Sequence, residues 1–203
     1  MDKHQAEEAL SIIRDVIENT REDLVAHNWG VIWLVHAFTN ATAFASIGWF
    51  VERRQLSLLW YLVPMAVVAA LNLLIIAALV ERDRGVRSYV EWQVNGIWVT
   101  FIVFSLAAAA VLQLSGAPPV LLGPLITVTS GIAFAMMGVV FYSRFFVVAA
   151  AFLVLAVAIA APPVSGLQWY LIAAAWWAAL FVPGMILFSE KRRRQRREET
   201  RIL

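Results

Sequence analysis

A few polar side chains interrupt the long apolar stretches of this chain, and they are the residues best placed to do chemistry. His36 and Asn40 stand four positions apart, so a helix would present both on one face. In antiparallel helices rising about 1.5 Å per residue, His36 would lie roughly 10 Å from one end of its helix and Asn72 roughly 12 Å from the matching end of the next. Because histidine titrates near neutral pH, these three residues predict a polar, proton-sensitive layer.

Thr100 and Ser130 extend this predicted layer. Thr100 falls at a depth similar to that of His36 in the third apolar stretch, and Ser130 falls near the middle of the fourth, level with Asn40. Polar groups are costly in hydrocarbon unless they find partners. The layer is therefore either a small functional site or a set of interhelical hydrogen bonds that fix packing, worth about 0.6–2 kcal/mol each.

Two adjacent tryptophans form the second candidate site. Most of the nine tryptophans fall near the ends of apolar stretches, where indole rings anchor helices at the membrane interface. Trp176 and Trp177 instead fall in the middle of the last stretch. Such a pair can line an apolar pocket for a lipid or ligand, with the indole N–H seeking an acceptor. The alternative is that both rings fill space opposite alanine-rich helix faces.

The residues contain no recognisable reaction centre. The chain has no H-E-x-x-H or G-x-S-x-G motif, no carboxylate pair within an apolar stretch and no phosphate-binding loop. It has no cysteine, which excludes disulfides, cysteine-ligated zinc and iron–sulfur clusters. We therefore expect a protein that is not an enzyme, with no catalytic residue, no metal site and no cofactor.

The distribution of charge predicts the elements that position these residues. Charged side chains are missing from four long intervals: Asp23 to Glu52, Arg54 to Glu81, Glu91 to Arg144, and Arg144 to Glu190. A membrane-spanning helix needs roughly 20 apolar residues, so the first two intervals fit one span each and the last two fit two each. The composition, 62% hydrophobic and 15% charged, agrees with a membrane protein. The sequence predicts an all-α polytopic membrane protein with six transmembrane helices in a compact bundle.

The expected spans are residues 29–51, 57–80, 94–114, 120–142, 145–161 and 167–188, within a transmembrane domain of residues 28–189. Gly and paired Pro residues end the third and fifth spans. The segment Ala-Pro-Pro-Val at 117–120 recurs at 161–164, and Trp-Tyr-Leu at 60–62 recurs at 169–171. The recurrences fit three helical-hairpin repeats, or they are coincidences among apolar segments.

The two ends of the chain carry opposite charge. Residues 1–27 have the pattern of an amphipathic helix with an acidic face, and residues 190–203 form a basic tail. The positive-inside rule places both termini in the cytoplasm of a multi-pass inner-membrane protein, because only Arg53 and Arg54 then lie outside. Anionic lipid repels the acidic helix, so residues 2–27 are expected to dock on protein, either this chain or another membrane or cytoplasmic protein.

These features favour a non-enzymatic interaction, accessory or sensory subunit whose partners are the lipid bilayer and another protein. Nucleic acid is not expected as a partner, since the basic charge serves membrane topology. The alternative is a small-solute or lipid transporter that uses the layer of His36, Asn40 and Asn72. A transporter needs that layer to reach solvent, whereas a structural subunit encloses it. The sequence leaves the oligomeric state open.

Overall fold

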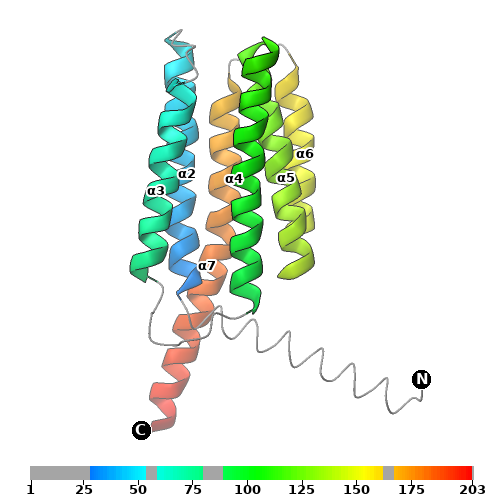
Figure 1. Ribbon diagram of the computed structural model, residues 1–203. Helices are drawn as coiled ribbons and strands as arrows, with labels where there is room; N and C mark the ends of the chain where they lie inside the picture. Colours follow the sequence, from blue (N-terminus) through cyan, green and yellow to red (C-terminus); the bar gives the residue numbers. More distant parts are fainter. Residues whose placement is uncertain (1–27, 54–58, 80–88, 162–166, 203) are drawn as a thin grey trace, which may run out of the picture.

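The computed structural model describes residues 28–53, 59–79, 89–161 and 167–202, and helices are the only regular secondary structure within those ranges. The elements are α2 (Trp29–Glu52), α3 (Leu59–Leu79), α4 (Tyr89–Ser115), the 3₁₀ helix η1 (Pro119–Leu121), α5 (Leu122–Val140), α6 (Phe145–Ala160) and α7 (Gln168–Ile202). The helices stand side by side in one bundle, and α7 continues beyond the others at one end (Figure 1). The amphipathic helix predicted for residues 1–27 lies outside the described residues.

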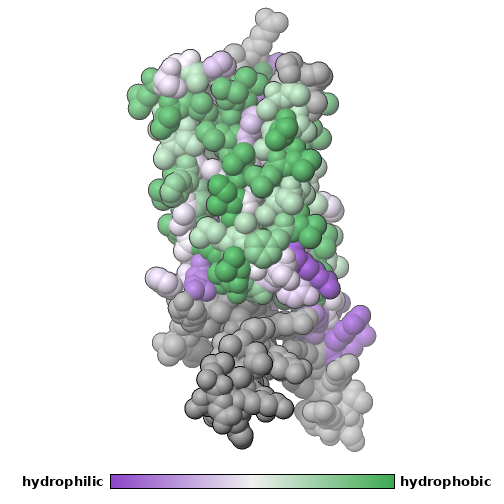
Figure 2. Space-filling view, turned by 90° about the vertical axis from the view of Figure 1, so that its right-hand side faces the viewer, coloured by the Kyte–Doolittle hydropathy of each residue, from purple (hydrophilic) through white to green (hydrophobic). Residues whose placement is uncertain are grey.

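Four of these helices are long and apolar enough to cross a membrane: Trp29–Glu52, Trp92–Ser115, Pro119–Val140 and Gln168–Arg193. The remaining two contribute shorter apolar segments, Tyr61–Ile75 and Phe145–Ala160. Figure 2 shows a broad apolar surface on one face of the bundle, with hydrophilic side chains gathered toward its ends. The prediction of an all-helical, apolar bundle is therefore confirmed, while four helices rather than six meet the length and composition of a span.

The turns follow local chemistry. Gly116 takes a positive φ of 68° directly after α4, a conformation that glycine adopts without a steric penalty. The Ala117 amide then donates to the Leu112 carbonyl at 3.2 Å, which satisfies a backbone acceptor at the end of α4. Helices α5 and α6 are joined by only a short turn, in which the Phe145 amide donates to the Tyr142 carbonyl at 2.9 Å. This turn makes α5 and α6 antiparallel neighbours.

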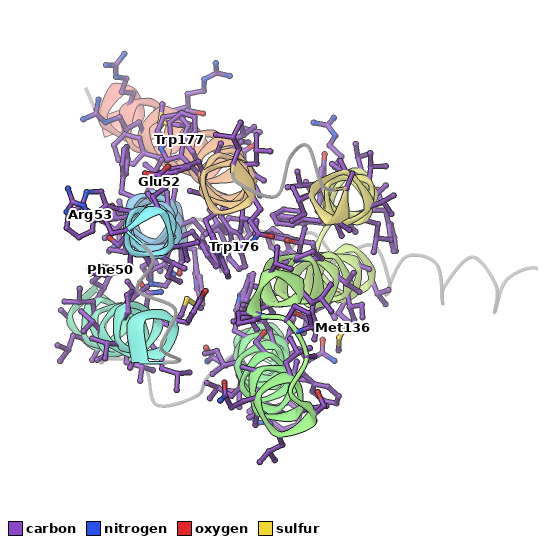
Figure 3. All side chains as sticks on the ribbon, turned by 90° about the horizontal axis from the view of Figure 1, so that it is seen from above. Phe50, Glu52, Arg53, Met136, Trp176 and Trp177 are labelled. Carbon is purple, nitrogen blue, oxygen red and sulfur yellow. The ribbon has the colours of Figure 1, made fainter. Side chains whose placement is uncertain are left out.

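The helices form two groups of three. In the first group, α2 packs against both α7 and α3. In the second group, α5 packs between α4 and α6. The two groups meet where α7 contacts α5 and α6, as the view down the bundle shows (Figure 3). The predicted three-hairpin repeat pairs α6 with α7, but α6 packs chiefly on α5 and α7 packs chiefly on α2. The repeat thus remains a prediction drawn from sequence.

Glycines set the closest helix contact, between α2 and α7. A Cβ atom built on Gly30 would lie 2.6 Å from the Phe188 backbone nitrogen, so only glycine fits at that crossing. At the other end of α2, a Cβ on Gly48 would lie 3.1 Å from both the Trp169 Cβ and the Tyr170 ring. The start of α2 thus meets the later part of α7, and the end of α2 meets the start of α7. The two helices are antiparallel and in contact along the whole length of α2.

Candidate functional sites

The predicted polar layer is a hydrogen-bonded chain between α2 and α3. The Thr39 hydroxyl donates to Asn72 Oδ1 at 2.8 Å, and Asn72 Nδ2 donates to Asn40 Oδ1 at 3.3 Å. Asn40 Nδ2 in turn donates to the His36 carbonyl oxygen of its own helix at 2.9 Å. An asparagine amide has both donors and an acceptor, so Asn72 can bond two adjacent residues of α2 at once. The arrangement ties the two helices together at mid-depth.

Helical periodicity places Asn72 at this interface. Tyr61, Met65, Val68 and Asn72 are spaced by four, three and four residues, and all are buried or half-buried. That spacing forms one stripe along a helix, and the stripe faces α2 because α3 packs on α2. The opposite face of α3 is exposed, with Leu73 and Leu74 among its most accessible side chains.

His36 enters the layer mainly through its backbone. Its carbonyl oxygen accepts the bond from Asn40 and a 3.3 Å bond from the Thr39 hydroxyl. The half-buried imidazole has a buried Nε2 with no hydrogen-bond partner. Thr39 is not among the residues predicted for the polar layer, yet its 2.8 Å hydrogen bond to Asn72 is the shorter of the two side-chain bonds between α2 and α3. The signal that could have found it is its position beside Asn40, within reach of the same asparagine amide.

Two predicted members of the layer lie elsewhere. Thr100 is exposed on α4. Ser130 is fully buried in α5 and donates to the Ile126 carbonyl of its own helix at 2.7 Å. A separate polar link joins their helices, because the hydroxyls of Ser105 on α4 and Thr129 on α5 lie 3.2 Å apart. Each group of three helices thus has its own cross-helix hydrogen bond, and the described residues place His36, Asn40 and Asn72 in only one of them.

The tryptophan pair divides between the inside and the outside of the bundle. Trp176 is 3% exposed and Trp177 is 36% exposed, since neighbours on a helix point about 100° apart. Five aromatic rings from four other helices surround Trp176 at centroid distances of 5.4–6.0 Å: Phe44 of α2, Trp98 and Phe101 of α4, Phe134 of α5 and Phe152 of α6. Trp176 therefore fills the place where the two groups of helices meet, toward the middle of Figure 3.

Three buried polar atoms on α7 have no hydrogen-bond partner: Gln168 Oε1, Trp169 Nε1 and Trp176 Nε1. Gln168 is 2% exposed, and its amide occupies the space left by Gly123, where a Cβ would lie 2.6 Å from Oε1. Leaving a buried polar group unpaired costs about 1–3 kcal/mol. The segment of α7 from Gln168 to Trp176 thus keeps unpaired polar atoms inside an aromatic core at an energetic cost.

Cationic side chains lie at both ends of the described bundle. At the end where α2 begins, Lys191 Nζ donates to Asn28 Oδ1 at 2.6 Å, and the Arg192 guanidinium lies 4.9 Å from the Phe188 ring. At the opposite end, the Arg53 guanidinium lies 3.6 Å from the centroid of the Trp49 ring.

Within the described ranges, no group of three or more histidine or acidic side chains has the arrangement of a metal site.

Comparison of the chain with protein-family models, with curated proteins and with solved structures finds no match. Function must therefore be argued from the arrangement of this chain's own residues.

Proposed function

We propose that the chain is a six-span protein of the cytoplasmic membrane, with both termini inside, and that it acts as a non-enzymatic interaction or accessory subunit. Two short helices complete the six spans. Helix α3 has 21 residues, about 31 Å at 1.5 Å per residue, which matches a hydrocarbon core of about 30 Å. Helix α6 has 16 residues and is about 24 Å long. A short turn joins it to α5, which is long enough to span the bilayer, so α6 must run back beside α5.

The charge at the two ends supports this orientation. Arg144, Lys191 and Arg192 lie at the end of the bundle where α2 begins, because Phe145 contacts Trp33 and Lys191 bonds Asn28. Arg53 lies at the other end. Lysine and arginine are concentrated on the cytoplasmic side of membrane proteins, so the end carrying Lys191 is assigned to the cytoplasm.

The observation that carries the interaction role is the length of α7. Its 35 residues form one helix, about 52 Å long at 1.5 Å per residue, so it extends well past the bilayer core. The helix continues beyond the bundle (Figure 1), and exposed Arg192, Arg193 and Arg196 follow the point where Lys191 meets the start of α2. A rigid basic arm of this kind suits an acidic partner, either the acidic residues 2–27 of this chain or a separate protein. The filled centre around Trp176 also favours a solid scaffold over a transport path.

Neutralising the arm tests the proposal. We expect the Arg192→Gln/Arg193→Gln variant to lose proteins that co-purify with the wild type from native membranes, as measured by quantitative mass spectrometry. Arg144→Gln is the matched control, since it removes a cation from the same end of the bundle but not from α7. An identical set of co-purified proteins for all three chains would refute an interaction role for the arm.

A transporter that uses the polar layer is the second candidate. The unpartnered Nε2 of His36 and the attachment of α3 through α2 favour it, because a helix held on one side can move away from the other group. The chain has no cysteine, so single cysteines at Asn40 or Asn72 report solvent access directly. Labelling by a water-soluble maleimide at both sites would support transport, with buried Ser130→Cys and exposed Arg53→Cys as the negative and positive controls.

A further inference from the structure

An aromatic patch on the outside of the α2–α7 pair has no role in the proposed function. The patch consists of Phe38, Trp177 and Phe181. The Trp177 and Phe181 rings stack at 4.4 Å, and Phe38 meets both edge-on, at 6.2 and 6.1 Å. Phe38 is 55% exposed and Trp177 is 36% exposed. In Figure 3, Trp177 lies on the side of α7 away from Trp176 and the centre of the bundle.

The depth of this patch makes it unusual for a lipid-facing surface. Trp177 lies nine residues after Gln168, about 14 Å along the helix, which is close to the middle of a bilayer core of about 30 Å. Lipid-facing tryptophan is favoured at the interface, where the indole N–H finds an acceptor. Acyl chains at mid-depth offer no acceptor, so an indole ring that is 36% exposed at this depth favours a protein neighbour that supplies one.

Thr42 supplies a suitable acceptor at the same depth. It is exposed on α2 one turn after Phe38, so both side chains share the outer face of that helix. Between the crossings at Gly30 and Gly48 the helices run antiparallel. Thr42, six residues before Gly48, is therefore level with the residues about six after Tyr170, which are Trp176 and Trp177.

Equal depth is the requirement of a symmetric pair in a membrane. Two identical chains inserted in the same direction are related by a two-fold axis along the membrane normal, so residues of one depth face residues of that depth in the other copy. We infer that the patch is the interface of a homodimer, in which the Trp177 indole N–H of each copy donates to the Thr42 hydroxyl of the other. Exposed Ala174 and Ala178 flank Trp177 and allow the helices to approach closely.

Cysteine cross-linking tests the interface without removing any aromatic ring. Thr42→Cys and Ala178→Cys are made singly in the otherwise cysteine-free, full-length chain, which is purified and reconstituted in lipid vesicles. Because Thr42 and Ala178 lie beside the two-fold axis rather than on it, each is expected to form a covalent dimer with a short bis-maleimide cross-linker rather than by direct disulfide formation. Ala151→Cys, exposed near the middle of α6, is the matched control and should stay monomeric. Cross-linking at Ala151 equal to that at Ala178 overturns the assignment.

Mass measurement in nanodiscs tests the energetics. Trp177→Leu and Ala178→Leu should each weaken dimerisation at least tenfold, while Phe104→Leu and Ala151→Leu, at exposed positions on other helices, should leave it unchanged. Thermal unfolding of each variant checks that the fold is retained. A wild-type chain that is monomeric in both vesicles and nanodiscs overturns the inference, as does Ala178→Cys cross-linking only to a different protein in native membranes. The interface is independent of the basic arm, so Arg192→Gln/Arg193→Gln should dimerise like the wild type.

Discussion

Replacing Gly30 by alanine tests the closest backbone contact in the molecule. The new methyl group would lie 2.6 Å from the Phe188 nitrogen, 3.0 Å from its Cα and 3.1 Å from the Gly184 carbonyl oxygen. All three are backbone atoms of α7, so no side-chain rotation can relieve the clash. To reach ordinary contact distances the helices must separate by roughly 1 Å, given that carbon atoms pack best at about 3.5–4.0 Å.

The magnitude follows from that displacement. Overpacking of a tight contact destabilises the fold by about 1–3 kcal/mol. The higher helix propensity of alanine offsets roughly 1 kcal/mol of this at most. The same separation would stretch the nearby bond from Lys191 Nζ to Asn28 Oδ1, now 2.6 Å, beyond good hydrogen-bond length. We expect Gly30→Ala to destabilise the folded bundle by about 2 kcal/mol relative to wild type.

The assay is thermal unfolding in detergent, followed by intrinsic tryptophan fluorescence. Gly96→Ala is the matched control, because a Cβ at Gly96 meets nothing within 4 Å. Gly184→Ala should fall between the two, since its nearest atoms are Leu34 Cγ and the Leu34 backbone nitrogen, both at 3.1 Å. Equal melting temperatures for Gly30→Ala and Gly96→Ala would show that α2 and α7 do not cross at this glycine.

Three further predictions follow from the site. Trp176→Leu should lose about 3 kcal/mol of folding free energy, because it removes the ring at the centre of five aromatic contacts. Trp177→Leu should lose only about 1 kcal/mol in monodisperse detergent micelles, because that ring's only aromatic contacts among the described residues are Phe181 and Phe38; thermal unfolding compares them, and equal losses would contradict the inside–outside division. Asn72→Leu and Thr39→Val should be non-additive by about 0.6–1.7 kcal/mol in a double-mutant cycle of unfolding, and strict additivity would mean that their 2.8 Å bond contributes nothing. A membrane-impermeant maleimide should label Ser115→Cys in intact cells and Ser143→Cys only after permeabilisation; the reverse pattern would invert the proposed topology.

The helices could be predicted from the sequence because their main determinant is the absence of charge. The intervals free of charged residues contain every described helix except the last residue of α2 and parts of α4 and α7. The predicted spans differ from α2, α3, α5 and α6 by no more than two residues at either end. The prediction stopped the last span at residue 188, where charge begins, but α7 continues to Ile202. Charged residues end a span without ending a helix, so hydropathy could not locate that terminus.

The relative rotation of helices was harder to predict. Adjacent Trp176 and Trp177 have the same chemistry and nearly the same depth, and only the position of neighbouring helices decides which one is enclosed. The same limit applies to Thr100, whose depth matched the polar layer but whose side chain is exposed on α4. Depth could be calculated from residue number, whereas facing direction depends on contacts between helices distant in sequence, such as the approach of Gly30 to Phe188.

The pairing of α2 with α7 also constrains the order in which the protein is assembled. Helix α2 leaves the ribosome long before its main neighbour α7, which follows all the other described helices in the chain. During that interval Thr39 and Asn40 would face hydrocarbon unless another helix covered them. Helix α3 is synthesised next and brings Asn72, so an α2–α3 hairpin can satisfy these groups early. The glycine crossing at Gly30 forms only after α7 has been synthesised, so the α2–α7 contact is the last of the described α2 contacts to form.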